Sequence, residues 1–466
     1  MRRSRQCATW LLLLLGVWAI GSEAADVYLS ISRGGGQRLR LAIPDFMLTE
    51  GGRSLDDGLG REMAQTLAED LRVYRFFDVI ENRQFLQEAA QADAHAGNIV
   101  FTEWAELGAQ ALVKGTFAQD GRDFISECRL FDVPGQSMIA GKRYRGSGDD
   151  IASMMHRCAD EIMLRFTGTP GIAQTKVAFL SRQRGNKELF TMDYNGSNIR
   201  QITQERSIVL SPAWSPDGKE IAITTYRDRN PDLFAIGLNG HGRRPLSQQP
   251  GLNSAAAWSP DGSRLAFVLT RDGNPEIYSM SRNTSDVRRL TSHPAIDTSP
   301  TWSPTGRQIA FVSDRSGSPQ IYIMEAEGSN VRRLTYEGNY NASPSWSPRG
   351  DRIAFSSMEG GRFDVFVINV DGSGLQRLTD SNGSNESPSW APDGRFLVFS
   401  STRTGTPQLF RMYDDGSGQQ QLTFLEGGGS EPWMVTPPGR VTLPRQQTSS
   451  PIHSMERSAR CVVPCS

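Results

Sequence analysis

Short polar triplets with small side chains recur in the second half of the chain, each just ahead of a tryptophan. They read Asn253-Ser254-Ala255, Asp297-Thr298-Ser299, Asn341-Ala342-Ser343 and Asn385-Glu386-Ser387, and a related stretch reads Gly429-Ser430-Glu431. Carboxylates, amides and hydroxyls beside small residues suit the binding of a basic or hydrogen-bonding segment of a partner. An ordinary ring of solvated loops is the alternative. The pattern favours recognition over catalysis.

Other chemistry finds little support in the sequence. The five histidines are scattered, without ligand-like spacing to cysteine or carboxylate pairs. No Gly-x-Ser-x-Gly elbow of a serine hydrolase occurs. Gly58-Leu59-Gly60 lacks the third glycine of a dinucleotide-binding turn. The 50 Lys and Arg residues balance 51 Asp and Glu residues, so there is no global basic field for nucleic acid.

The triplets belong to a repeat. A Trp-[Ser/Ala]-Pro-x-Gly pentad starts at Trp214, Trp258, Trp302, Trp346 and Trp390, and each step is 44 residues (258 − 214, and so on). Each unit carries four short Val/Ile/Phe-rich strands separated by Gly, Pro and Asp turns, which is typical of a propeller blade. The tryptophan and its turn are expected to be structural, because the indole buries a large area between blades.

The number of blades follows from the ends of the repeat region. Five full units run from Trp214 to just before Trp433, and only three strands precede them, near 176–181, 188–193 and 199–203. A single strand, Trp433-Met434-Val435, follows them. These fragments complete one another, so the sequence predicts an all-β six-bladed propeller with split-blade closure, which removes exposed sheet edges. The triplets then converge around one mouth of the channel.

The preceding region, residues 38–168, predicts an α/β domain with a mixed sheet. Expected strands lie near 39–46, 77–81, 111–117, 124–132 and 138–144, and expected helices near 55–74, 84–92, 102–107 and 151–166. Residues 169–175 form the linker to the propeller at 176–436. Cys128 and Cys158 either form a disulfide or are two buried small residues.

The N-terminus predicts export. Arg2, Arg3 and Arg5 precede an apolar run from Trp10 to Ile20 and then small residues, which is the pattern of a signal peptide over residues 1–24. The run is too short to span a bilayer, so we expect a soluble mature protein. Residues 25–37 form a predicted flexible arm: Asp26, Val27, Tyr28, Leu29, Ser30, Ile31, Ser32 and Arg33 alternate in polarity, and three glycines follow. An ordinary edge strand is the alternative.

This order of signal peptide, small α/β domain and propeller with Trp-Ser-Pro-Asp-Gly and Arg-Arg-Leu-Thr motifs resembles the TolB family of the Tol-Pal envelope system. The resemblance covers residues 1 to about 436. It implies a periplasmic, non-enzymatic adaptor that supports outer-membrane integrity and cell division. The lipoprotein Pal would dock at the propeller mouth, TolA at residues 26–33, and other outer-membrane lipoproteins or porins are further possible partners.

Transferred by position, the Pal-binding residues are those of the triplets, with Asn253, Ala255, Thr298 and Ser299 as the strongest matches. The full set is Asn253, Ser254, Ala255, Asp297, Thr298, Ser299, Asn341, Ala342, Ser343, Asn385, Glu386, Ser387, Ser430 and Glu431. This chain departs from the family pattern at Leu252, where a histidine occurs, and at Ser299, where a carboxylate occurs. Residues 437–466 also depart from it, and their Pro, Ser and Arg content predicts a disordered tail.

Two alternatives to an adaptor remain. Similar propellers cap serine peptidases of the prolyl oligopeptidase type, but the first domain is too short for their hydrolase fold. Alternatively, channel carboxylates such as Asp297 and Glu386 could hold a calcium ion together with carbonyl groups. We expect no other cofactor.

Overall fold

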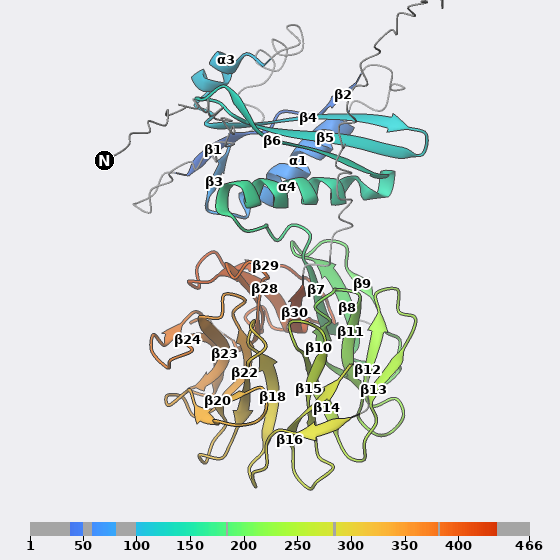
Figure 1. Ribbon diagram of the computed structural model, residues 1–466, viewed down its shortest axis with the longest axis vertical. Coiled ribbons are helices and arrows are strands. Elements are labelled where there is room, and N and C mark those ends of the chain that lie inside the picture. The colour runs from blue at the N-terminus through green and yellow to red at the C-terminus, as the bar shows by residue number, and fades with distance from the viewer. Residues whose placement is uncertain are drawn as a thin grey trace, which may run out of the picture. The chain divides into compact units, whose positions relative to one another are not determined.

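The structure is a computed structural model that describes residues 38–49, 58–80, 99–182, 185–282, 286–380 and 383–435 (Figure 1). The predicted signal peptide, the N-terminal arm, the helix expected at 84–92 and the tail at 437–466 lie outside these residues. The described residues form an α/β domain followed by a propeller, as predicted from the sequence.

The α/β domain is built on a mixed sheet with the strand order β3-β1-β4-β5-β6, and β2 pairs with β4. The pairs β1–β3, β1–β4 and β2–β4 are parallel, whereas β4–β5 and β5–β6 are antiparallel. The elements are β1 Leu39–Ala42, β2 Met47–Leu48, α1 Leu59–Arg72, β3 Phe77–Val79, α3 Phe101–Glu106, β4 Ala111–Asp120, β5 Asp123–Asp132, β6 Ser137–Ser147, a 3-10 turn at Gly148–Asp150 and α4 Ile151–Thr167.

Helices cover both faces of this sheet. Met63 and Leu67 of α1 and Met154 of α4 share a core with Leu41 of β1, because four-residue spacing places apolar side chains on one helix face. Trp104 of α3 packs in a separate cluster with sheet residues of the opposite face. Helix α4 ends at Gly168, whose φ of 73° a side chain would strain.

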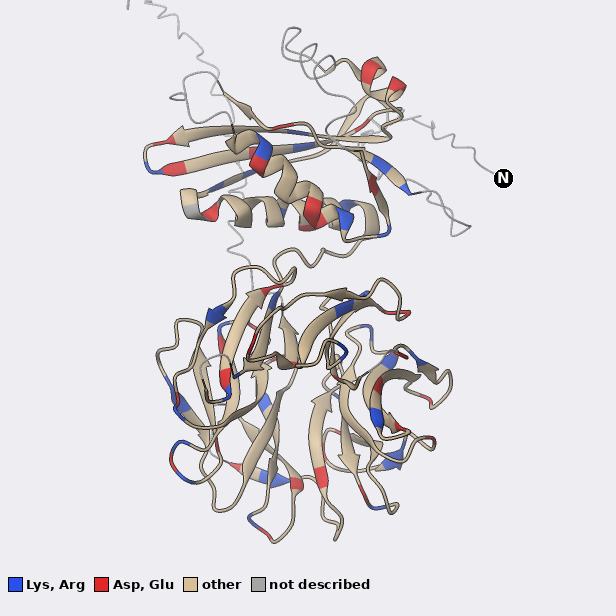
Figure 2. Cartoon of the chain, turned by 180° about the vertical axis from the view of Figure 1, so that it is seen from behind, with Lys and Arg blue, Asp and Glu red and all other residues tan. Residues whose placement is uncertain are grey.

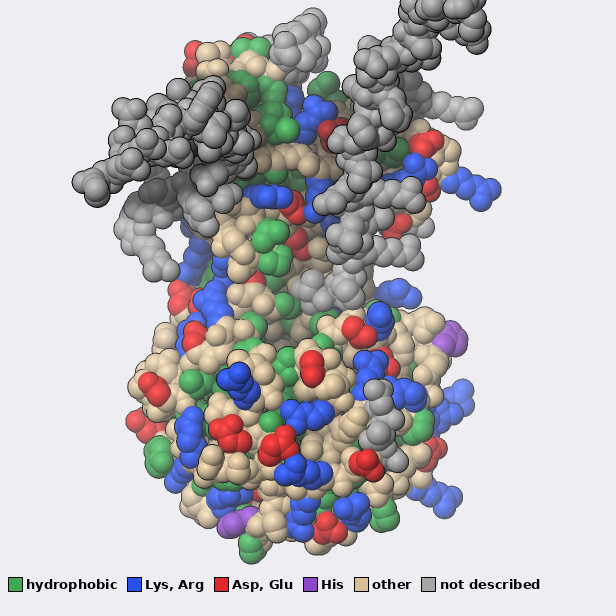
Figure 3. Space-filling view, viewed as in Figure 1, with side chains coloured by type: hydrophobic (Ala, Val, Ile, Leu, Met, Phe, Trp, Pro, Cys, Tyr) green, Lys and Arg blue, Asp and Glu red, His purple; other side chains and the backbone are tan. Residues whose placement is uncertain are grey.

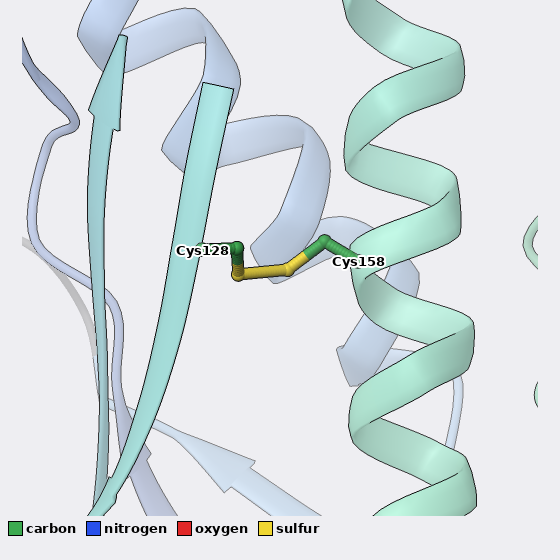
Figure 4. The surroundings of a disulfide bond; sticks show 2 residues. All are labelled: Cys128 and Cys158. Atoms are coloured by element: carbon green, nitrogen blue, oxygen red, sulfur yellow. A yellow bond between two sulfur atoms is a disulfide. The ribbon is translucent and has the colours of Figure 1, made fainter. Parts of the chain in front are cut away.

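Cys128 of β5 and Cys158 of α4 form a disulfide, which decides between the two alternatives left by the sequence (Figure 4). The bond ties the long helix to the antiparallel part of the sheet. Both cysteines are buried. A disulfide between these elements is consistent with an oxidising compartment.

The propeller consists of six four-stranded antiparallel sheets in the described part of the chain (Figures 1 and 2). Blade 1 comprises β10 Val209–Trp214, β11 Glu220–Thr225, β12 Asp232–Gly237 and β13 Arg244–Ser247; blade 2 comprises β14 Asn253–Trp258, β15 Arg264–Leu269, β16 Glu276–Ser281 and β17 Val287–Arg289. Blade 3 comprises β18 Asp297–Trp302, β19 Gln308–Ser313, β20 Gln320–Glu325 and β21 Arg332–Arg333; blade 4 comprises β22 Asn341–Trp346, β23 Arg352–Glu359, β24 Arg362–Asn369 and β25 Gln376–Arg377. Blade 5 comprises β26 Asn385–Trp390, β27 Phe396–Ser401, β28 Gln408–Tyr413 and β29 Gln420–Gln421.

Blade 6 is shared between the two ends of the repeat region. It comprises β30 Ser430–Val435 and the three strands β7 Lys176–Ser181, β8 Glu188–Asp193 and β9 Arg200–Gln201. Strand β30 pairs antiparallel with β7, with Trp433 opposite Ala178 and Val435 opposite Lys176. Strand β30, from the end of the repeat region, is therefore the innermost strand of blade 6, and β7, β8 and β9, from its beginning, are the other three.

The repeated tryptophans join neighbouring blades. The indole nitrogens of Trp302, Trp214 and Trp390 donate to the carbonyl oxygens of Ala257, Trp433 and Ser345, at 3.0, 3.1 and 3.1 Å. Each acceptor lies on the first strand of the preceding blade. The structural role expected for these residues is confirmed for these three. The indole nitrogens of Trp258 and Trp346 are buried without a hydrogen-bond partner among the described residues.

The turn after the tryptophan carries an aspartate in blades 1, 2 and 5, and two of these aspartates lie in different environments. At Asp261, hydrogen bonds from the Ser259 and Ser263 hydroxyls lower the pKa of the carboxyl from 3.8 to about 2. At the equivalent Asp393, alanine replaces the serine of the turn, and burial raises the pKa of the carboxyl to about 6. One Asp393 oxygen has no hydrogen-bond partner within the described residues.

The propeller and the α/β domain share one hydrophobic cluster, within a compact unit that begins at Leu39. Asp70 of α1 is 1% exposed and accepts a hydrogen bond from the Tyr194 hydroxyl at 2.7 Å. The Tyr413 hydroxyl donates to the carbonyl oxygen of Val73 at 2.7 Å. Asp160 of α4 holds the linker by accepting from the backbone of Ala173 at 2.8 Å. These bonds fix the linker and the first domain to blades 5 and 6.

The tryptophan hydrogen bond can be isolated with a matched pair of substitutions. Trp302 and Trp258 are both 6% exposed and both lie beneath an arginine, but within the described residues only the indole N–H of Trp302 has an acceptor. We expect Trp302→Phe to lower the free energy of unfolding by about 1 kcal/mol more than Trp258→Phe, because a buried carbonyl loses its donor. Chemical denaturation of both variants measures this difference, and equal losses would contradict the role of the bond.

The buried Asp393 carboxyl predicts a pH dependence. Because its pKa is raised to about 6, its contribution to stability is present below about pH 4 and is lost as the pH rises through 6. Asp393→Asn removes this loss. We therefore expect the free energy of unfolding of the variant to exceed that of the parent protein by about 1–3 kcal/mol at pH 7.5 and to equal it at pH 4. Denaturation curves at both pH values test this.

Asp261→Asn serves as a control in which the pKa of the replaced carboxyl is lowered instead of raised. Its lowered pKa means that the ionised carboxyl stabilises the fold above about pH 4 and that this stabilisation fades toward pH 2. This variant should lose stability at pH 7.5. A pH-independent effect of Asp393→Asn would show that its burial does not control its protonation.

Candidate binding site at the propeller mouth

The residues expected in loops at the mouth lie instead at the start of the first strand of each blade. Asn253, Asp297, Asn341 and Asn385 are the first residues of β14, β18, β22 and β26, and Ser430 begins β30. The prediction of loops was wrong at these positions. Small polar residues weakened the apparent strand signal, because strand propensity depends on packing that the sequence pattern does not display.

A β-bulge follows in every one of these strands. Pairing to the second strand of the blade is interrupted, for example between Thr298 and Thr301 in blade 3. The third triplet residue has a positive φ in each blade: 50° at Ser211, 49° at Ala255, 52° at Ser299, 52° at Ser343, 54° at Ser387 and 50° at Glu431. Five of these six residues precede a proline, which donates no ladder hydrogen bond and therefore fits at a bulge.

The bulges turn the third triplet residues toward the channel. Their side chains and the following residues line a pocket of about 120 Å³ at the mouth. The lining residues are Ser211, Pro212, Ala255, Ala256, Ser299, Pro300, Ser343, Pro344, Ser345, Ser387, Pro388, Glu431, Pro432 and Trp433. Ala255, Ser299, Ser343, Ser387 and Glu431 are thus brought together, as the sequence predicted.

The first triplet residues are buried instead. Asn253, Asp297, Asn341 and Asn385 are all fully buried. The Asp297 carboxylate accepts two hydrogen bonds from Arg315, at 2.8 and 3.1 Å, and Asn385 accepts one from Arg403 at 2.9 Å. These four residues lie buried behind the mouth, and their assignment to Pal binding stays a prediction.

The second triplet residues and Ser430 occupy an intermediate layer. Ser254, Thr298, Ala342, Glu386 and Ser430 are half-buried and lie beside the pocket wall without lining it. Burial raises the pKa of the Glu386 carboxyl, so this group favours the neutral form more than a solvated glutamate does. The Asp297 carboxylate accepts two hydrogen bonds from Arg315. The calcium ion expected near Asp297 and Glu386 stays a prediction.

One charge lies on the inner ring of the mouth. The Glu431 carboxylate accepts from Lys187 Nζ at 2.6 Å and from the backbone N–H of Ser211 at 2.7 Å. It thereby bridges β30 of blade 6 to blade 1. Apart from Trp433, the rest of the lining consists of small and proline side chains, which leave room for an inserted segment.

An apolar rim around this pocket escaped the sequence analysis. Ile208, Ile296 and Tyr340 are 49%, 47% and 40% exposed, and each immediately precedes the first residue of an inner strand. Leu252 holds the same place in blade 2 and is half-buried. The 44-residue spacing of these four residues was a signal that could have revealed the rim. Elsewhere, the propeller face in Figure 3 carries interspersed acidic and basic side chains.

The mouth lies at the end of the ring opposite the contacts with the α/β domain. First and third strands of a blade run in the same direction, since each is antiparallel to the second. The mouth forms where first strands begin, whereas Tyr413, which contacts Val73, is the last residue of the third strand β28. The mouth is therefore not covered by the described part of the first domain.

Comparisons with known proteins identify the family. The profile described as the TolB beta propeller domain matches residues 163–365 and 341–460, and that of the TolB amino-terminal domain matches residues 27–139. The chain belongs to the TolB family. The propeller match reaches residue 460 and so enters the segment 437–466.

Similar curated proteins carry the name Tol-Pal system protein TolB. One from Desulfosudis oleivorans is 39% identical over 200 residues, which are 43% of this chain and 45% of that protein. One from Geobacter sulfurreducens is 43% identical over 222 residues, which are 47% of this chain and 50% of that protein. The chain thus spans about half the length of the curated relatives it matches.

A solved structure extends the likeness across both domains. The crystal structure of TolB from Acinetobacter baumannii is 28% identical and has a TM-score of 0.74. The match covers 86% of this chain and 97% of that one. Within the described residues, no helix has both the length and the apolar character needed to cross a membrane.

Proposed function

We propose that this member of the TolB family is a non-enzymatic periplasmic adaptor of the Tol-Pal system. It binds Pal at the propeller mouth and TolA through residues 26–33, and it supports outer-membrane integrity and envelope constriction during cell division. Outer-membrane lipoproteins or porins are further candidate partners. The observation that carries the proposal is the open pocket of small residues at the mouth, in a chain whose relatives are named for this system.

The geometry of the mouth favours binding over catalysis. Its inner ring offers hydroxyls, prolines and one glutamate that is already paired with Lys187. The exposed side chains of Ile208, Ile296 and Tyr340 add an apolar surface at which aromatic or aliphatic anchors of a partner would be desolvated. Such a surface binds a protein segment without a cofactor or a metal ion.

Export is part of the proposal. The tripartite pattern at residues 1–24 favours secretion, and the disulfide between Cys128 and Cys158 is stable in an oxidising compartment such as the periplasm. Residues 25–37 then form the arm at the start of the mature chain.

A charge placed on the inner ring should block Pal. Ser299 lines the pocket, and its backbone conformation at φ 52° carries a non-glycine residue already. We expect Ser299→Arg to weaken Pal capture by about 100-fold or more, because a bulky charge must be buried when the partner enters. Binding of purified Pal to the mature protein measures this.

Thr305→Arg is the matched control, since Thr305 is exposed in the turn after Trp302 at the far end of the same blade. It changes the charge equally and should leave Pal capture intact. Normal capture by Ser299→Arg, with an unchanged melting curve, would contradict the assignment of the mouth.

The arm should act on a different partner. Deleting residues 26–33 is expected to abolish TolA binding and to keep Pal binding, because the mouth is built entirely from the propeller. Parallel binding measurements with purified TolA and Pal check this. Loss of both activities together would show that the arm has only a structural role.

A further inference from the structure

Blade 4 departs from the repeat in the loop between its second and third strands, and one of the changed positions reverses the charge of a side chain. Residues 227, 271, 315, 359 and 403 occupy one repeat position at 44-residue steps. Four of them are arginines, and the fourth in order is Glu359. The surroundings of this position show what the arginine does in the other blades and what its loss leaves in blade 4.

In blades 3 and 5 the arginine is held by the same three features. Arg315 Nε donates to Ser313 Oγ at 2.8 Å, and its terminal nitrogen donates to Asp297 at 2.8 Å. Its guanidinium lies 5.5 and 5.1 Å from the ring centres of Phe311 and Tyr322.

Arg403 repeats this arrangement in blade 5. Its Nε donates to Ser401 Oγ at 2.8 Å, its terminal nitrogen donates to Asn385 Oδ1 at 2.9 Å, and its guanidinium lies 5.5 and 4.5 Å from the rings of Phe399 and Phe410. A serine hydroxyl, an amide or carboxylate oxygen and two aromatic rings therefore form an arginine cradle in both blades.

Blade 4 retains the cradle without the arginine. Phe355 and Phe366 stack with ring centres 6.0 Å apart, and Ser357 and Asn341 hold the places of the serine and the acceptor. Both amide hydrogens of Asn341 are used, by Gln320 at 2.7 Å and by the carbonyl oxygen of Glu337 at 2.8 Å, which fixes the orientation of the amide.

The acceptor of this cradle is unsatisfied. Asn341 is fully buried, and its Oδ1 has no hydrogen-bond partner among the described residues. A side chain built on Gly338 would meet both Ser357 Oγ and Asn341 Oδ1, so the two oxygens lie close to the same point. A buried acceptor without a donor costs stability unless a ligand supplies one.

A pocket of about 80 Å³ opens at this cradle, between blades 3 and 4. Its wall includes Phe355, Ser357, Phe366 and Gly338, and two carboxylates, Glu337 and Glu359, also line it. Aromatic faces together with carboxylates attract a cation.

Two arginines of blades 3 and 4 close to this pocket are engaged elsewhere. Arg377 is bonded to Asp364 and to the carbonyl oxygen of Thr379, and it lies 3.6 Å from Glu359. Arg333 donates to the carbonyl oxygen of Thr335 at 2.6 Å and lies over Tyr336. Neither one occupies the place that Arg315 and Arg403 hold in their blades.

We propose that the cradle of blade 4, formed by Phe355, Phe366, Ser357 and Asn341, is a binding site for an arginine side chain of a partner protein. The guanidinium would lie over the two phenylalanines, donate to Ser357 Oγ and Asn341 Oδ1, and face Glu337 and Glu359. Arginine is favoured over lysine because its planar fork matches two acceptors while its face stacks on aromatic rings. This site is separate from the mouth, so it adds to the proposed function without depending on it.

The probe for this site is N-acetyl-L-arginine amide, titrated into the folded full chain and followed by NMR. We expect saturable millimolar binding that perturbs Phe355 and Phe366, and no binding of the citrulline analogue, which has the same shape but no charge. Because the probe is a single amino-acid derivative, the result is independent of whether Pal or TolA binds. Equal binding of both compounds, or no binding of the arginine derivative, would overturn the proposal.

Restoring the internal arginine provides the second test. Glu359→Arg should fill the cradle as Arg315 and Arg403 do, raise the melting temperature and weaken the binding of the probe by about tenfold or more. Glu426→Arg, at an exposed position of blade 5, changes the charge equally and should do neither. Undiminished probe binding by a stable Glu359→Arg protein would show that the compound binds elsewhere.

Discussion

The pairing of β30 with β7 is the constraint on which the propeller depends. Blades 1 to 5 are each continuous in sequence, but blade 6 exists only when residues near 433 meet residues near 178. Without this antiparallel pairing, the first and last sheets of the ring would each expose an unpaired edge. Because the closing strand also carries Glu431, ring closure and the inner wall of the mouth are completed by the same residues.

Closure works together with a second repeated interaction, the contact of each blade with its predecessor. Indole donors of Trp214, Trp302 and Trp390 reach carbonyl oxygens on the preceding inner strand. The repeat tolerates local exceptions, such as the buried Asp393 and the indoles of Trp258 and Trp346, which have no hydrogen-bond partner in the part of the chain that the structure describes. Stability that is distributed over many similar contacts allows individual blades to diverge, and divergence is where binding sites arise.

The two surfaces that distinguish this chain show such divergence in different ways. At the mouth, the same bulge in every blade presents small side chains to a common pocket, so the site belongs to the ring as a whole. At the cradle of blade 4, one replaced arginine leaves a pocket that belongs to a single blade junction. In this member of the TolB family, residues of all six blades form the mouth pocket, whereas the cradle pocket lies where one blade departs from the repeat.

The sequence by itself determined the number of blades, the split blade and the mixed α/β domain, because spacing and periodicity depend only on order along the chain. It also predicted that the triplets meet at one mouth of the channel, and the third residue of each triplet lines the pocket there. It did not reveal that Asn253, Asp297, Asn341 and Asn385 are buried, since a polar residue in a turn-rich stretch resembles a loop. The bulges, the disulfide and the cradle of blade 4 were decided only by tertiary structure, because each depends on which residues meet across strands, helices and blades.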